Sequence, residues 1–188
     1  MIFASGNGSN AQRIIDYFKD NQDVQVALIL TNNPKAYVLN HAKKANISAF
    51  SFNHTAFYDM DHVLNLVNIA QADLIILAGF LWLFPKKILD LYPKKVINIH
   101  PALLPNFGGK GMYGMHVHKA VCDFAKAQKE QFFSGITIHY VTPEYDKGAI
   151  LFQAKVEVVS SETPESLAKK VRALEHEHFP KVIERLLN

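Results

Sequence analysis

Short apolar segments alternate with amphipathic segments through most of the chain. Apolar runs of this kind are typical of buried strands in a parallel sheet, and apolar positions spaced three or four apart are typical of helices that cover its faces. The predicted strands cover Ile2–Ser5, Val24–Leu30, Ala49–Phe52, Leu74–Leu77 and Val96–His100, and the predicted helices cover Ala11–Lys19, Tyr37–Lys44, Asp59–Ala70 and Lys86–Leu91. This alternation predicts an α/β fold with a mostly parallel, doubly wound sheet.

The pattern changes in the C-terminal third of the chain. A helix is predicted over Met115–Lys126, two longer strands over Phe132–Val141 and Ala149–Val158, and a closing helix from Thr163 to Leu187. A short turn-like segment joins the two strands, so we expect them to be antiparallel neighbours added to the sheet. Thr163 is the expected N-cap of the last helix, with Pro164 in its first turn. Without repeats or a flexible linker, residues 1–188 are expected to form a single domain.

Composition narrows the class of protein. The 188 residues are 49% hydrophobic and 20% charged, an ordinary globular balance, and the formal charge of +3 is too small to indicate nucleic-acid binding. The single cysteine, Cys122, excludes an internal disulfide and suits a reducing compartment. The longest apolar stretch, Leu74–Phe84, is too short to cross a bilayer, and the N-terminus does not resemble a signal peptide. We therefore expect a cytoplasmic protein that binds small molecules, not membranes, and the sequence leaves its oligomeric state open.

A glycine-rich loop, Ser5-Gly6-Asn7-Gly8-Ser9-Asn10-Ala11, links the first strand to the first helix. Glycines let the backbone approach a ligand, and the free N–H groups of a helix N-terminus attract anions, most naturally a phosphate. The same spacing fits the dinucleotide pattern G-x-G-x-x-A, which also requires an acidic residue after the second strand. That strand is followed by Thr31-Asn32-Asn33 instead, which favours a single phosphate over a nicotinamide cofactor.

The fifth strand ends on two polar side chains, Asn98 and His100. Residues two apart on a strand share a face, and ligands bind at the carboxyl ends of strands in open α/β sheets. The pair is either a buried, satisfied histidine with a turn-capping asparagine or part of an active site. If the loop Thr142–Gly148 folds towards this strand end, Asp146 could orient His100 and raise its pKa, although an Asp in a turn is more often a turn-former.

Three further features have weaker signals. Leu81, Trp82, Leu83 and Phe84 follow the fourth strand and are either core or the lining of a slot for a flat aromatic ligand. The loop of residues 101–114 carries several glycines and Lys110, and loops of this length are often functional. The pairs His116/His118 and His176/His178 lack zinc-site spacing, so no metal site is predicted.

The order of the motifs gives a resemblance that covers essentially the whole chain. Gly6-Asn7-Gly8-Ser9-Asn10 is followed by Asn98-Ile99-His100-Pro101 with Leu103-Leu104-Pro105, and then by Gly135-Ile136-Thr137-Ile138-His139-Tyr140-Val141 leading to Asp146. In this order the chain resembles the phosphoribosylglycinamide formyltransferases, a family with a Rossmann-like formyltransferase fold. The Asn, His and Asp are shared with a wider formyltransferase and hydrolase group, and the Gly6–Asn10 loop narrows the resemblance.

The resemblance implies transfer of a formyl group from 10-formyltetrahydrofolate, as co-substrate, to the amine of glycinamide ribonucleotide in purine biosynthesis. It implies that Asn98, His100 and Asp146 are catalytic and that Gly8, Ser9, Asn10 and Glu175 contact the ribonucleotide. It further implies that Leu81, Trp82, Leu83, Phe84 and Val141 surround the folate. The relatives' usual Arg near the folate tail has no counterpart in Phe57-Tyr58-Asp59-Met60.

The chemistry we expect is direct acyl transfer through a tetrahedral intermediate. Asn98 and a protonated His100 would stabilise the oxyanion, while Asp146 would hold His100 and help to remove the proton of the amine. The alternatives are a formyltetrahydrofolate hydrolase, transfer of the formyl group to methionyl-tRNA, and a non-catalytic nucleotide-binding module. The first two families carry an extra N-terminal or C-terminal domain, whereas this sequence starts at its first strand and ends after its last helix, so we expect the transferase.

Overall fold

A computed structural model describes residues 1–128 and 130–188 of the chain. Strands and helices alternate as far as β5, and a helix, two long strands and a long helix follow. The elements are β1 (Ile2–Phe3), α1 (Ser9–Phe18), β2 (Ile29–Thr31), α2 (Val38–Lys44), β3 (Ala49–Ser51), α3 (His54–Tyr58), α4 (His62–Ala70), β4 (Ile75–Leu77), α5 (Lys86–Leu91), β5 (Val96–His100), α6 (Met115–Lys126), β6 (Phe132–Tyr140), β7 (Ile150–Val158) and α7 (Pro164–Leu187).

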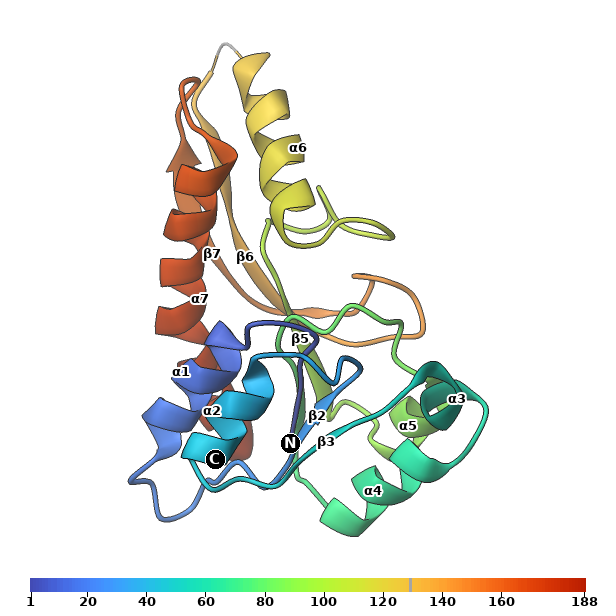
Figure 1. The fold of residues 1–188 in the computed structure, drawn as a ribbon. Helices are drawn as coiled ribbons and strands as arrows, with labels where there is room; N and C mark the ends of the chain where they lie inside the picture. The colour runs from blue at the N-terminus through green and yellow to red at the C-terminus, as the bar shows by residue number, and fades with distance from the viewer. Residues whose placement is uncertain (129) are drawn as a thin grey trace.

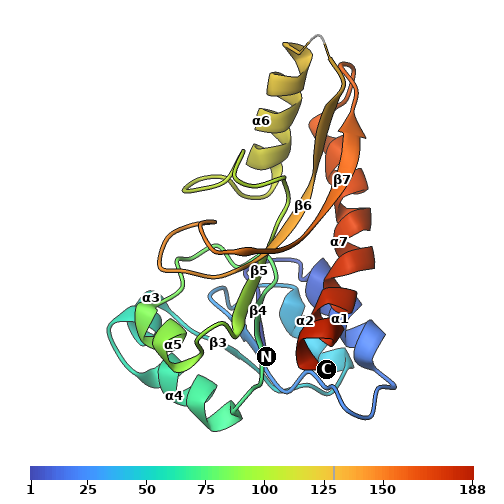
Figure 2. The ribbon, with the colours of Figure 1, turned by 180° about the vertical axis from the view of Figure 1, so that it is seen from behind.

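The strands form one seven-stranded sheet in the order β3-β2-β1-β4-β5-β6-β7. The first five strands of this order are parallel, while β6 pairs antiparallel with both β5 and β7. The long β6–β7 hairpin extends away from the parallel part of the sheet together with α6 and α7 (Figures 1 and 2). This arrangement confirms the predicted fold class, including the antiparallel strands in the C-terminal third.

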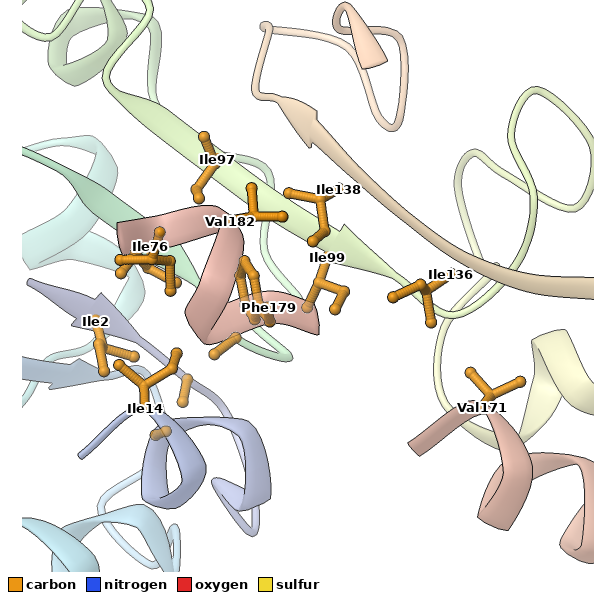
Figure 3. Packing of buried hydrophobic residues seen from close by; sticks show 14 of the residues in the cluster. Ile2, Ile14, Ile76, Ile97, Ile99, Ile136, Ile138, Val171, Phe179 and Val182 are labelled. Atoms are coloured by element: carbon orange, nitrogen blue, oxygen red, sulfur yellow. The ribbon is translucent and has the colours of Figure 1, made fainter. Parts of the chain in front are cut away.

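Helices cover both faces of the sheet, as expected for a doubly wound fold (Figure 1). On one face, α1, α2, α6 and α7 pack against side chains such as Ile2, Ile97 and Ile138, and Phe179 of α7 is fully buried among them (Figure 3). On the other face, α3, α4 and α5 pack against a second cluster that includes Phe3. Because neighbouring strand residues point to opposite faces, even the two residues of β1 contribute one side chain to each cluster.

The predicted helix over Asp59–Ala70 corresponds to α4, which begins three residues later at His62, but the short helix α3 that precedes it was not predicted. Helix α3 begins earlier, where the Asn53 side chain accepts a hydrogen bond from the Ala56 N–H (2.9 Å). It ends in a turn in which the Met60 N–H returns to the Thr55 carbonyl (2.9 Å). The apolar pattern runs through both helices, so periodicity alone does not show the break between them.

The second predicted strand, Val24–Leu30, is also longer than the observed one. Only Ile29–Thr31 form a ladder, because the flanking β1 and β3 are themselves two and three residues long. Val24 and Val26 instead pack, partly buried, against the core. In the last helix, the Thr163 side chain accepts from the Ser166 N–H (3.2 Å), which confirms the predicted N-cap. Within the described residues, no helix is both long enough and apolar enough to cross a membrane.

Candidate active site

Asn98 and His100 lie on one face of β5, at its carboxyl end. Ile97 and Ile99 alternate with them and enter the core on the opposite face. The neighbouring strand β6 continues this polar face, because His139 is paired with Asn98 and Thr137 with His100 in the antiparallel register. His100 and His139 are only 3% and 2% exposed, so their ring nitrogens need partners inside the protein.

Asp146 lies next to His100, in the loop that joins β6 to β7. Its Oδ2 is 3.5 Å from His100 Nδ1, and its Oδ1 is 3.5 Å from His139 Nε2. The Gly109 N–H donates a hydrogen bond to Oδ2 (2.8 Å). The backbone of Asp146 is left-handed (φ 55°), a conformation that Asp and Asn adopt more readily than most residues. The loop therefore folds towards the end of β5, and the carboxylate lies between two imidazoles.

His139 is a site residue to which the sequence analysis assigned no role. Its Nδ1 is 2.8 Å from the Tyr140 carbonyl oxygen, and its Nε2 is 3.1 Å from Asn98 Nδ2. A carbonyl oxygen can only accept, so Nδ1 carries a hydrogen, while Nε2 contacts the Asn98 amide. His139 thereby orients Asn98. Strand alternation was the available signal, since His139 shares a face with Thr137 in the run that precedes Asp146.

The proton on the resting His100 ring can be placed in the same way. His100 Nε2 is 2.8 Å from the Phe107 carbonyl oxygen, so Nε2 bears the hydrogen and donates. Burial lowers the pKa of His100 below its usual value, and the opposing effects of Asp146 and the Phe107 carbonyl do not restore it. Asp146 does act to raise the pKa of His100, as expected, but burial lowers it by more, so the resting ring is neutral at neutral pH instead of protonated, and its Nδ1 lone pair faces the carboxylate.

Asp146 itself is ionised in this arrangement. Burial acts to raise the pKa of Asp146, but the neighbouring His139 and His100 side chains, with the Gly109 N–H, outweigh burial and hold the pKa below its usual value. A carboxylate thus faces the unprotonated Nδ1 of His100 across 3.5 Å. Two acceptors in this position can share one added proton, which makes the pair a potential general base.

A cavity of about 590 Å³ opens beside these residues, and it brings nearly all of the predicted site residues together. Asn98, His100 and Asp146 lie in its wall, together with Ser9, Asn10, Glu175, Val141 and the run from Leu81 to Phe84. Gly8 is the exception, because it does not line the cavity. It takes a left-handed conformation (φ 70°) before α1, and a Cβ there would lie 2.6 Å from Val38 Cγ2.

Part of the cavity wall is polar. Asn10 Nδ2 donates to Glu175 Oε2 (2.9 Å), which connects the start of α1 to α7, while Asn10 Oδ1 is buried without a partner in the protein. Burial raises the pKa of Glu175 above its usual value despite this hydrogen bond and the positive charge of Arg172. Arg172 precedes Glu175 by three residues on α7 and also lines the cavity. The spacing of one helical turn was the signal that sequence reasoning missed.

Another part of the cavity wall is apolar. Leu81 and Trp82 are partly exposed there, whereas Phe84 is buried in the core. The Tyr58 hydroxyl donates to the Leu83 carbonyl (2.7 Å) and holds this segment against α3. The structure thus supports both interpretations of the run, with Phe84 in the core and Trp82 in the wall of a slot.

His118 is a second residue that sequence reasoning left without a role. It lies on α6 in the cavity wall, is 6% exposed, and its Nδ1 has no hydrogen-bond partner in the protein. Burial lowers the pKa of His118 to about 4, and the charges of Arg172 and His100 act in the same direction. His118 is therefore neutral at physiological pH. Lys110 and Tyr113, in the loop of residues 101–114, also line the cavity.

The fold and this constellation define a class of enzymes that act on formyl groups. Residues 1–183 match the family described as formyl transferase. The chain belongs to the formyl transferase family.

The most informative relatives are phosphoribosylglycinamide formyltransferases. The chain is 38% identical to the chloroplastic enzyme of Arabidopsis thaliana over 97% of this chain and 63% of that protein, so it spans less than two thirds of that relative. It is 34% identical to the enzyme of Bacillus subtilis over 99% of this chain and 93% of that protein. The crystal structure of the Anaplasma phagocytophilum enzyme is similar with a TM-score of 0.85 and 32% identity, covering 99% of this chain and 85% of that one. These findings confirm the resemblance identified in the sequence.

Proposed function

We propose that this protein transfers the formyl group of 10-formyltetrahydrofolate to the amine of glycinamide ribonucleotide. The observation that carries the proposal is a cavity whose wall combines Asn98, His100 and Asp146 with both a polar group of residues and an apolar group. A transferase with two substrates needs both to reach one reacting centre, and this cavity offers a different chemical surface to each. The full-length similarity to phosphoribosylglycinamide formyltransferases supports the same substrates.

The ribonucleotide is assigned to the polar part of the wall. Ser9 and Asn10 lie in the first turn of α1, where free backbone N–H groups favour a phosphate, and Gly8 allows the tight entry into that helix. Arg172 supplies a positive charge on the opposite wall. The unpartnered Asn10 Oδ1 and the carboxyl group of Glu175 are hydrogen-bonding groups for the sugar and the glycinamide portion.

The folate is assigned to the apolar part of the wall. A pterin ring is flat and aromatic, and it fits a slot lined by Leu81, Trp82 and Val141. The backbone of Leu83, held by Tyr58, and the loop that carries Asp146 form the edges of this slot. This places the formyl group near Asn98 and Asp146, between the two substrates.

The reaction follows from the protonation states in the site. The amine attacks the formyl carbon, a C–N bond forms, and the carbonyl electrons move onto the oxygen, where an Asn98 N–H stabilises the charge. The proton released by the amine is taken up by the Asp146–His100 pair, which turns His100 into a cation beside the oxyanion. The intermediate then collapses, the bond from the formyl carbon to the folate nitrogen breaks, and the proton returns to that nitrogen. No covalent enzyme intermediate and no metal enter this sequence.

One assay tests the function. The protein is incubated with 10-formyltetrahydrofolate in the presence and absence of glycinamide ribonucleotide, and the loss of the formyl folate is followed. We expect loss only when the ribonucleotide is present, with one formylated ribonucleotide formed per folate consumed. Equal loss without the ribonucleotide would indicate a hydrolase, and no loss under either condition would indicate a binding module.

The remaining assignments belong to the same proposal. We assign two small-molecule partners, with no nucleic acid and no membrane, and a cytoplasmic location. The small net charge of +3 and the single, buried Cys122 support these assignments.

A further inference from the structure

A short turn, Phe107–Gly109, lies in the loop of residues 101–114 and contacts both His100 and Asp146. The Phe107 carbonyl accepts the hydrogen bond from His100 Nε2 (2.8 Å), and two residues later the Gly109 N–H donates to Asp146 Oδ2 (2.8 Å). These backbone groups come from a segment outside β5 and outside the loop that carries Asp146. The relative position of the imidazole and the carboxylate therefore depends on the shape of this turn.

Backbone conformation and close packing both restrict the shape of the turn. Phe107 has a left-handed conformation (φ 55°), and Gly109 has a φ of 100° that an L side chain rarely adopts. Gly108 has no room for a side chain, since a Cβ would lie 3.2 Å from Asp146 Cβ and 2.5 Å from Leu104 Cδ2. The turn is thus packed directly against Asp146 and cannot shift without displacing the carboxylate.

An aromatic cluster outside the cavity holds the turn in place. The ring of Phe107 packs edge-on against Phe124 of α6 and Phe132 of β6, with centroid distances of 5.7 and 6.4 Å. Phe124 and Phe132 also pack against each other, at 5.2 Å. Neither Phe124 nor Phe132 lines the cavity. Their ring contacts with Phe107 connect them to the turn.

We propose that the Phe107–Gly109 turn is the positioning element of the His100–Asp146 pair. Its carbonyl selects the tautomer of His100 in which Nδ1 faces the carboxylate, and its amide holds the carboxylate at that nitrogen. This inference rests on the proposed function only for its effect on turnover; the tautomer and the position of the carboxylate are properties of the protein without substrate.

The tautomer matters because only one nitrogen of His100 can share a proton with Asp146. With the hydrogen on Nε2, a proton taken from the substrate enters between Nδ1 and Oδ2. In the other tautomer Nδ1 would already carry a hydrogen, and Nε2 would present its lone pair to the Phe107 carbonyl, where no proton is available. The charged and titratable groups that face His100 are Asp146, His139 and His118, and the turn adds only uncharged backbone groups.

The first test compares two alanine substitutions in the same loop. Gly109→Ala and Gly111→Ala both introduce a side chain at a positive φ (100° and 88°) with no atom within 4 Å of the new Cβ. Only Gly109 donates to Asp146. The ¹⁵N shifts of the His100 ring and the ¹³C titration of the Asp146 carboxyl group are measured by NMR without substrate.

We expect Gly109→Ala to raise the pKa of Asp146, because Ala does not readily adopt the φ of 100° and the reshaped turn moves the residue-109 N–H away from the carboxylate, and to convert His100 from the Nε2–H form to a mixture of tautomers. In Gly111→Ala we expect both properties to match the wild type. In the formyl-transfer assay we expect kcat to fall about 100-fold in Gly109→Ala, the scale expected when a catalytic group is misplaced by about 1 Å. A wild-type Asp146 titration and an unchanged His100 tautomer in Gly109→Ala would overturn the proposal.

A second pair of variants keeps the test decisive if Gly109→Ala does not fold. Phe132→Ala removes a ring that holds Phe107, whereas Phe133→Ala removes its exposed neighbour, which has no ring contact with Phe107. We expect the same NMR changes in Phe132→Ala, in smaller degree, and none in Phe133→Ala. Identical His100 and Asp146 signals in both phenylalanine variants would refute a positioning role for the turn. Because these signals need no substrate, they separate this inference from a failure of the proposed activity.

Discussion

Replacing Asp146 by asparagine is the most direct perturbation of the proposed reaction. Asn has nearly the same shape and tolerates the left-handed backbone at this position (φ 55°), so the loop should keep its conformation. Its side-chain oxygen can still accept the Gly109 N–H that now donates to Oδ2 at 2.8 Å. The substitution therefore removes the charge and the basic oxygen and leaves the packing in place.

The expected magnitude follows from the distance to His100. A carboxylate and an imidazolium 3.5 Å apart attract each other by about 5 kcal/mol at an effective dielectric constant of about 20. That energy is the scale of what Asp146 contributes once His100 has gained the proton. Loss of a general base typically lowers kcat by about 10²–10⁴-fold, or about 2.7–5.4 kcal/mol, which is comparable with this energy.

The assay measures kcat in single-turnover experiments and the affinity for glycinamide ribonucleotide by calorimetry. We expect kcat of Asp146→Asn to fall by about 10²–10⁴-fold while the ribonucleotide affinity stays within a few-fold of the wild type, because Asn10 and Glu175 belong to the polar part of the cavity wall. Asp123→Asn, which removes an exposed carboxylate on α6, is the control and should turn over normally. Turnover of Asp146→Asn at a near-normal rate would refute the assignment of Asp146 as the base.

Three further predictions test other parts of the structure. His100→Ala should lower kcat by orders of magnitude, about 10²-fold or more, with the ribonucleotide still bound in calorimetry, and a rate close to wild type would contradict the mechanism. His118 has a folded-state pKa of about 4, below that of the unfolded chain, so the unfolded state binds more protons between pH 6.5 and 4 and stability is lost as the pH falls through this window. His118→Gln should flatten that loss in urea melts at pH 4.5 and 7, and an unchanged pH slope would argue against a buried neutral His118. Phe179→Ala should destabilise the fold by about 3–5 kcal/mol, since Phe179 is fully buried at the centre of the α7-side core (Figure 3), and a shift below about 1 kcal/mol in the same melts would show that the core collapses to fill the cavity.

The aromatic cluster around Phe107 extends the site beyond the residues that touch substrate. Phe124 and Phe132 lie on α6 and β6, which follow the loop of residues 101–114. Both contact the ring of Phe107, whose carbonyl accepts the hydrogen bond of His100. Substitutions in this cluster would thus alter catalysis without altering the cavity wall. The position of the His100–Asp146 pair accordingly depends both on polar side chains in the cavity and on aromatic rings outside it.

The local pattern of apolar and polar residues was sufficient to predict most of the helices and strands. The alternation of apolar and amphipathic segments predicted every strand of the sheet and its antiparallel addition, because strands buried on both faces appear as short apolar runs between amphipathic helices. The errors lie at helix caps, turns and strand ends, which the spacing of apolar residues does not mark. The short helix α3, which follows the cap at Asn53 and ends at Tyr58, was not predicted, and the short partners of β2 limited the length of its ladder.

The sequence by itself determined the class of fold, the polar end of β5 at Asn98 and His100, and the glycine-rich entry to α1, because each depends on neighbouring residues. Only the tertiary structure decided that Asp146 lies 3.5 Å from His100, that His139 orients Asn98, and that burial leaves His100 neutral. A pKa depends on the balance of desolvation against charges and hydrogen bonds from distant segments. That balance exists only when β5, β6 and the loop of residues 101–114 are brought together, so no pattern along the chain contains it.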